Sequence, residues 1–158
     1  MFIHRFVPAI AGLSVLLSTV PVQAQTYQYD APPPRVINES GNEPERLAAD
    51  NQAVVYGTWD FNYSATPDGN LFVTRIFASD FGQGSAAASI QIDCGRGFFR
   101  HVVTPLFYAN GSSSGTPMND VAVNQWLVMD RQTSFGQAMM RSCEAAAAEE
   151  GTTWQWFN

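Results

Sequence analysis

The chain has 158 residues, with eight Arg, no Lys, 14 Asp or Glu, two Cys and a formal net charge of −6. A nucleic-acid-binding protein needs a basic face to displace phosphate counterions, and this sequence has no basic cluster. The absence of Lys excludes Schiff-base and P-loop chemistry. Because 46% of the residues are hydrophobic and only 14% are charged, the composition is that of a folded protein rather than a disordered acidic chain.

Residues 1–24 have the pattern of a secretory signal peptide. Arg5 supplies the positive start, an uncharged and mostly apolar stretch follows, and Val22 and Ala24 are the small residues expected before a cleavage site. The apolar run is short and is interrupted by prolines, which disfavours the alternative of a retained membrane helix. We expect an exported protein, periplasmic, secreted or at the cell surface. No transmembrane helix should remain after cleavage and, since no Cys follows the signal, we expect no lipid anchor.

Residues 25–52 are predicted to form a flexible leader. Three successive prolines at 32–34 favour extended polyproline conformation, and the residues after them are polar and acidic. One short helical turn is predicted over residues 46–50. A single folded domain is expected over residues 53–158.

The first part of this domain has the composition of β-structure. Ile90, Ile92 and Cys94 alternate with polar residues, which predicts a half-buried strand with Cys94 on its core side. Residues 109–120 are rich in Gly and Ser and predict a mobile loop. Strands are predicted at residues 54–61, 71–78, 89–94, 98–103 and 125–129, with residues 106–108 extending the fourth of them.

The last part predicts an amphipathic helix over residues 135–149. Ser134 is the expected N-cap, and Gln137 completes a capping-box pattern. Cys143 lies on the apolar stripe of this helix, and Cys94 is its only partner in the chain. In an oxidising compartment a disulfide is the expected state, and two buried free thiols are the alternative. The predicted fold is therefore α+β, an antiparallel sheet of about five or six strands with the C-terminal helix tied to one face.

Two stretches resemble a known family. Ile90–His101 reads IQIDCGRGFFRH, and Gln125–Cys143 reads QWLVMDRQTSFGQAMMRSC. Their order of Asp-Cys, Trp-strand, Ser-started helix and terminal Cys resembles the surface-adhesin protein E family of exported bacterial domains, over about residues 54–145. The resemblance implies a C-terminal helix fastened to an antiparallel sheet by Cys94 and Cys143, with Trp126 in the strand before the helix. It also implies a role as an adhesin that binds host extracellular proteins.

Four residues are candidates for binding: Arg96, Arg100, Trp154 and Trp156. The two arginines flank a predicted tight turn and can bind an anionic group through their planar guanidinium groups. Solvation at the surface, or pairing with nearby carboxylates such as Asp93, is the alternative and is favoured. The two tryptophans belong to an aromatic tail that either packs against its own domain, which is favoured, or binds a partner.

The sequence offers little for catalysis. His101 is the only histidine after the signal peptide, and a Ser–His–Asp triad would require it together with Asp93. There is no G-x-S-x-G motif and no metal-binding spacing, so no catalytic residue, metal or cofactor is predicted. We therefore expect a non-enzymatic binding module with a protein or glycan partner. The alternatives are a periplasmic hydrolase, a hydrolase inhibitor or a structural envelope protein.

Overall fold

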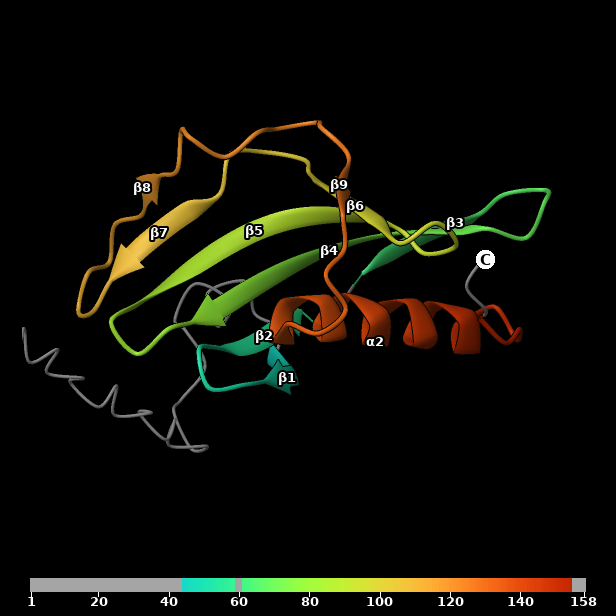
Figure 1. Cartoon of the computed structure of the whole chain (residues 1–158), viewed down its shortest axis with the longest axis horizontal. Helices are drawn as coiled ribbons and strands as arrows, with labels where there is room; N and C mark the ends of the chain where they lie inside the picture. Colours follow the sequence, from blue (N-terminus) through green and yellow to red (C-terminus); the bar gives the residue numbers. More distant parts are fainter. Residues whose placement is uncertain (1–43, 59–60, 155–158) are drawn as a thin grey trace, which may run out of the picture.

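The computed structural model describes residues 44–58 and 61–154, in which an antiparallel sheet carries one helix across one of its faces (Figure 1). Two ten-residue strands, β4 and β5, form the centre of the sheet. Strands β2 and β3 both pair with β4, and β6 and β7 both pair with β5, so each long strand is flanked by two short ones. The elements are β1 (Pro44–Ala49), β2 (Val54–Thr58), β3 (Asn62–Ala65), β4 (Leu71–Asp80), β5 (Gly84–Asp93), β6 (Phe98–His101), β7 (Leu106–Ala109), β8 (Thr116–Pro117), β9 (Leu127–Val128) and α2 (Ser134–Glu149).

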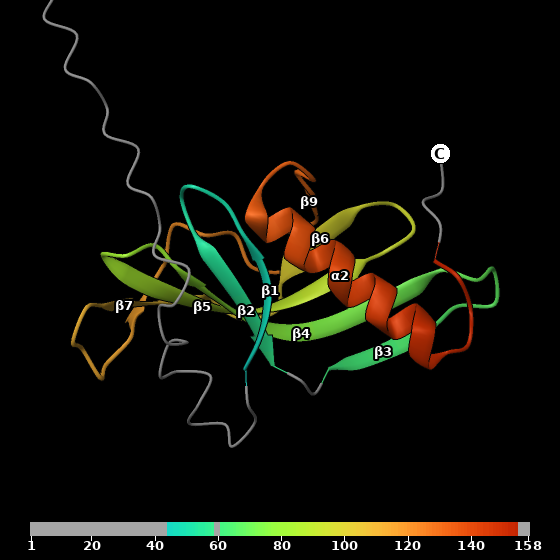
Figure 2. The same ribbon diagram turned by 90° about the horizontal axis from the view of Figure 1, so that it is seen from below.

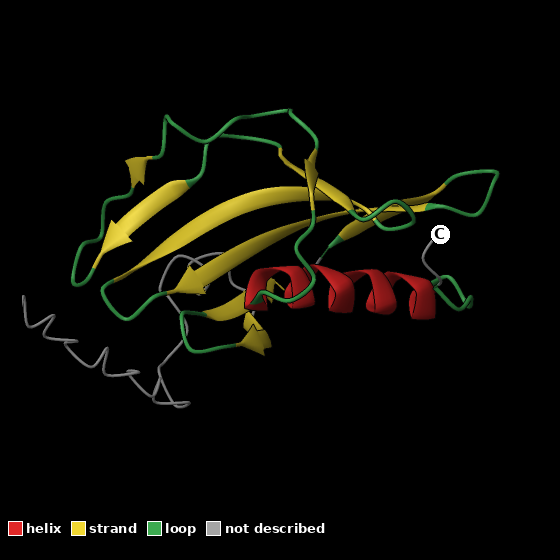
Figure 3. Ribbon diagram, in the orientation of Figure 1, coloured by secondary structure: helices red, strands yellow, loops and turns green. Residues whose placement is uncertain are grey.

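The predicted α+β class and antiparallel sheet are confirmed, but the described residues contain nine strands rather than about five or six. Strand β5 begins at Gly84, five residues before the predicted start, because its alanines carry no strand signal yet pair fully with β4. Residues 106–108 belong to a separate strand, β7, which pairs with Gly84–Ala87 of β5. Figure 3 shows how the loops at the two ends of the sheet connect these short strands.

The prediction of a flexible leader over residues 25–52 is wrong for its last part, which forms strand β1. Residues 46–50 form no helical turn: Pro44–Ala49 pairs with β2, and Leu47 is fully buried. Asp50 then turns the chain, because its Oδ1 accepts hydrogen bonds from the backbone N–H groups of Gln52 and Ala53 at 2.7 and 2.9 Å. The folded domain therefore starts before residue 53. The predicted signal peptide and the first part of the leader lie outside the described residues.

Helix α2 lies across one face of the sheet (Figure 2). It begins at Ser134, and its N-cap is Thr133 rather than the predicted Ser134: the Thr133 hydroxyl accepts a hydrogen bond from the Gly136 N–H at 3.1 Å. Ser134 is instead buried, and its backbone N–H donates to Oδ2 of Asp50 at 2.9 Å. No helix among the described residues has the length and apolar character needed to cross a membrane.

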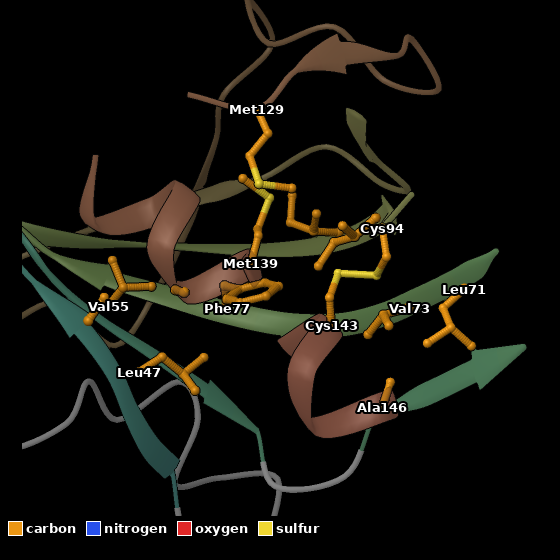
Figure 4. Packing of buried hydrophobic residues seen from close by; sticks show 14 of the residues in the cluster. Leu47, Val55, Leu71, Val73, Phe77, Cys94, Met129, Met139, Cys143 and Ala146 are labelled. Carbon is orange, nitrogen blue, oxygen red and sulfur yellow. A yellow bond between two sulfur atoms is a disulfide. The ribbon is translucent and has the colours of Figure 1, made fainter. Parts of the chain in front are cut away.

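The core fills the space between α2 and the sheet (Figure 4). Val73, Phe77 and Met139 are among its fully buried side chains. The predicted disulfide is confirmed: Cys94, at the end of β5, is bonded to Cys143 of α2, with their Cα atoms 5.8 Å apart. Both cysteines are completely buried, so the covalent link runs through the core and fastens the helix to the sheet.

One charged residue, Arg75, is part of this core and is only 2% exposed. Its Nε donates to the carbonyl oxygen of Thr58 at 2.7 Å, Nη1 to the hydroxyl of Ser142 at 3.1 Å, and Nη2 to Oε2 of Glu45 at 2.7 Å. Gly57 makes room for the guanidinium group, since a Cβ atom there would lie 2.6 Å from Nε. Through Arg75, strand β4 is bonded to β1, β2 and α2 at once.

Candidate binding surface on the open face of the sheet

The face of the sheet opposite α2, here called the open face, is set by strand alternation. Arg75 and Phe77 of β4 point towards the helix, so Phe72 and Ile76 point away from it. The register carries this face onto β5 and β6, where Gln91 lies opposite Arg100. This face is therefore built from side chains of several strands that are distant in the sequence.

Arg100 is held in position on the open face. Its Nε donates to Oε1 of Gln91 at 2.8 Å, and its guanidinium carbon lies 4.8 Å from the ring centre of Trp126. Trp126 in turn contacts Phe72, with ring centres 6.2 Å apart. Among the described residues, no carboxylate forms an ion pair with Arg100 and its Nη groups have no hydrogen-bond partner. The guanidinium group is thus oriented and still has donors available for an external anion.

Exposed apolar side chains lie on the same face of the sheet as this arginine. Trp126 is 39% exposed, Val128 of β9 is 75% exposed, and Ile76 is also exposed. We call the set Phe72, Ile76, Arg100, Trp126 and Val128 the open-face patch. Tryptophan and arginine contribute most often to the binding energy of protein interfaces, and exposed apolar patches frequently mark such interfaces.

The other candidate binding residues lie elsewhere. Arg96 is in the turn between β5 and β6, where its side chain is 66% exposed and its Nε is 3.8 Å from Oδ2 of Asp93, so the predicted pairing is present but loose. Trp154 is partly buried against the core, and its indole N–H donates to the carbonyl oxygen of Cys94 at 3.2 Å. Trp154 thus packs on its own domain, the interpretation favoured for the tail, whereas Trp156 lies outside the described residues.

The two residues that a catalytic triad would require are not brought together. His101 pairs with Ile90 on the helix side of the sheet, and Asp93 lies on the opposite face by strand alternation. The Asp93 carboxylate accepts hydrogen bonds from the Asn70 side chain and the Arg96 N–H, and so organises the turn. Within residues 44–58 and 61–154, no group of three or more His, Cys, Asp or Glu side chains is placed to hold a metal ion.

The sequence identified one member of the open-face patch and missed the rest. Arg100 is a candidate because of its position beside the tight turn, but its partner Trp126 is separated from it by a segment that contains β7 and β8. The one available signal is alternation: Trp126 and Val128 share a side of the strand predicted over residues 125–129, as Phe98 and Arg100 do in the strand predicted over 98–103. Only the pairing of β6 with β9 places these two sides on the same face.

No protein-family model, curated protein or solved structure matches this chain. The resemblance to the surface-adhesin protein E family therefore stays a prediction.

Proposed function

We propose that this protein is an exported binding domain that holds a protein partner on the open-face patch. The observation that carries the proposal is Arg100, which is fixed between Gln91 and Trp126 with its Nη donors free of described partners. An oriented guanidinium group loses little freedom when it binds, so it favours a specific contact more than a mobile surface arginine does. Export is supported by the signal-like sequence and by the buried disulfide, which is typical of oxidising compartments.

The chemistry of the patch defines the partner. Arg100 selects a carboxylate, Trp126 offers apolar surface beside it, and Ile76 and Val128 add exposed apolar surface on the same face. The expected partner therefore presents an Asp, a Glu or a chain-terminal carboxylate next to an apolar side chain. Because the net charge of this protein is −6, a strongly acidic partner would be repelled overall, and recognition should depend on one carboxylate rather than many.

A peptide selection tests this proposal. The purified protein is panned against a phage-displayed peptide library, and the affinities of the enriched peptides are measured by calorimetry for Arg100→Gln, Trp126→Ala and Arg96→Gln. Arg96→Gln is the matched control, since that arginine is exposed at the neighbouring turn and outside the patch. We expect the first two changes to weaken binding by about tenfold or more, as for residues at the centre of an interface, and the control to have no effect.

Two results would contradict the proposal. One is a library that yields no enriched sequence. The other is binding that Arg96→Gln weakens while Arg100→Gln and Trp126→Ala do not, which would move the site to the turn. Adhesion is the proposed setting of this binding, and it is tested separately by fractionating the tagged protein. Outer-membrane or surface display supports adhesion, whereas strict periplasmic retention contradicts it and leaves the binding proposal standing.

A further inference from the structure

The helix side of the sheet contains a pocket that the open-face patch does not use. Helix α2 starts at Ser134 and leaves part of this side uncovered, so that a pocket of about 390 Å³ remains between the helix start, β4 and β5, and the segments around His101 and Met118. At about 30 Å³ for each water molecule, this corresponds to roughly a dozen waters. Such a volume lies at the lower end of the range for small-molecule sites.

Small side chains on β5 create the hollow. Ala86 and Ala88 line the pocket where a sheet core would ordinarily carry Val or Ile, and they lie opposite Ser79 and Phe77 of β4. The walls are mainly apolar and include the rings of Phe77 and Phe135. A partly open hollow lined by alanines and aromatic rings suits a flat apolar molecule better than a sugar or a phosphate.

The polar groups of the pocket define the charge of its ligand. Among the described residues, Asp50 is the only charged one in the lining; its Oδ1 accepts from the Gln52 and Ala53 N–H groups, and its Oδ2 accepts from the Ser134 N–H. Burial raises the pKa of Asp50, but the hydrogen bonds together lower it by more than burial raises it. The pKa is therefore below its ordinary value, and the carboxylate stays ionised. A negative charge at the wall, with no arginine among the described lining residues, disfavours an anionic ligand.

His101 supplies an acceptor without a partner. Its Nδ1 atom is enclosed and, within the described residues, makes no hydrogen bond. Burial lowers the pKa of His101, so the ring is neutral at neutral pH and one of its nitrogens can accept. Enclosed acceptors without a donor are unfavourable, and a ligand N–H or O–H would relieve that cost. His101 lines the pocket and is only partly buried, and a half-turn about its Cβ–Cγ bond exchanges the positions of its ring nitrogens with those of ring carbons, so that Nδ1 need not stay enclosed.

We propose that this pocket binds a small aromatic molecule that is neutral or carries one positive charge and that donates a hydrogen bond to His101. The proposal is independent of the open-face patch, because the two sites use opposite faces of the sheet. The ionised carboxylate of Asp50 repels a fatty acid or another organic anion, so we do not expect such anions as ligands.

Two fluorescent probes that differ by one sulfonate test the proposal. N-phenyl-1-naphthylamine is neutral, aromatic and carries one N–H donor; 8-anilino-1-naphthalenesulfonate has the same rings and an added negative charge. We expect saturable binding of the neutral probe at one site, and binding of the sulfonate about tenfold weaker or more. His101→Phe, which keeps a ring in place, should weaken the neutral probe by about fivefold, as for the loss of one hydrogen bond.

Matched substitutions on β5 locate the site. Ala88→Phe fills the pocket and should weaken the neutral probe by about tenfold or more, whereas Ala87→Phe points to the open face and should have no effect. Ala86→Phe is a second filling variant for use if Ala88→Phe does not fold. Trp126→Ala should also leave the affinity unchanged, which separates this site from the open-face patch.

The wild-type protein gives a further test by NMR. Addition of the neutral probe should shift the methyl signals of Val55, Met118 and Val121, which line the pocket, and leave that of Val128 in place. The proposal is overturned if the neutral probe does not bind saturably, if both probes bind equally, or if shifts occur on the open face instead.

Discussion

Reducing the Cys94–Cys143 disulfide should destabilise the protein by an amount that follows from its position in the chain. The two cysteines are 49 residues apart, so the bond closes a long loop in the unfolded state. In the chain-entropy model, a loop of this size contributes roughly 4 kcal/mol to the free energy of unfolding. Small domains typically have about 5–15 kcal/mol in total, so the reduced protein should be only marginally stable.

The comparison that isolates this effect is between the oxidised and the reduced wild-type protein. Reduction keeps both sulfur atoms in the core, and so it removes the constraint on the unfolded chain without leaving a cavity. The double variant Cys94→Ala, Cys143→Ala also removes the sulfurs, and because both side chains are completely buried it should be less stable again. Urea unfolding followed by far-UV circular dichroism, with and without dithiothreitol, gives all three free energies.

The reasoning would be refuted if the oxidised and reduced wild-type proteins differed by less than about 1 kcal/mol, a fraction of what the loop model requires. A second contradictory result would be an alanine variant more stable than the reduced protein, because the buried sulfurs would then be unfavourable. Loss of helix signal on reduction, while the sheet signal remains, would show that the bond acts mainly by holding α2 against the sheet.

Three other changes should have distinct effects. Gly136→Ala should destabilise the protein by about 1–3 kcal/mol in thermal or urea unfolding, because the added Cβ would lie 2.7 Å from the carbonyl carbon of Asp130. Alanine ordinarily favours a helix over glycine, so an increase in stability would contradict this contact. Burial lowers the pKa of His101 below its ordinary value of 6.5. Between pH 6.5 and the lowered pKa, the unfolded chain binds a proton that the folded protein does not, so the free energy of unfolding should decrease as the pH is lowered through this range. His101→Phe should flatten this part of the pH profile, and an unchanged profile would refute the assignment. Glu45→Ala should lower the free energy of unfolding by about 1–2 kcal/mol, less than for a fully enclosed pair because Glu45 is 36% exposed, while Glu45→Gln, which retains an acceptor for Arg75, should cost less. No loss in Glu45→Ala would show that the ion pair does not contribute to stability.

The fold class could be predicted from the sequence because its signals are local. Alternation around Cys94 and the apolar stripe around Cys143 each assign one cysteine to a core-facing side, and the two assignments together place the helix on the sheet. Strand β1 could not be predicted in this way. The short apolar stretch at residues 47–49 lies between polar residues and shows no alternation, and only the pairing with β2 and packing against the core bury Leu47 and Ala48.

The sites were less predictable than the fold for a related reason. The open-face patch depends on the register of β6 with β9, which brings Trp126 to Arg100 although β7 and β8 lie between them in the sequence. The pocket depends on Ala86 and Ala88, whose small size is a weak signal until the neighbouring strands are known. Arg75 shows the same limit: alternation places it on the same side of its strand as Leu71 and Val73, but that this side faces the core, and that its partners lie on β1, β2 and α2, follows only from the structure.

The ion pair between Glu45 and Arg75 has a consequence for aggregation. Strand β1 is an edge strand of the described sheet, and on the other side of β2 lies only β4. If β1 were released, β2 would present unpaired N–H and C=O groups to any other copy of the protein, and the released strand could insert into a neighbour's sheet. By binding Glu45, the buried arginine therefore holds β1 in place, and β1 in turn covers the edge of β2. Variants that lack the ion pair between Glu45 and Arg75 should exchange strands and polymerise at concentrations where the wild-type protein stays monodisperse.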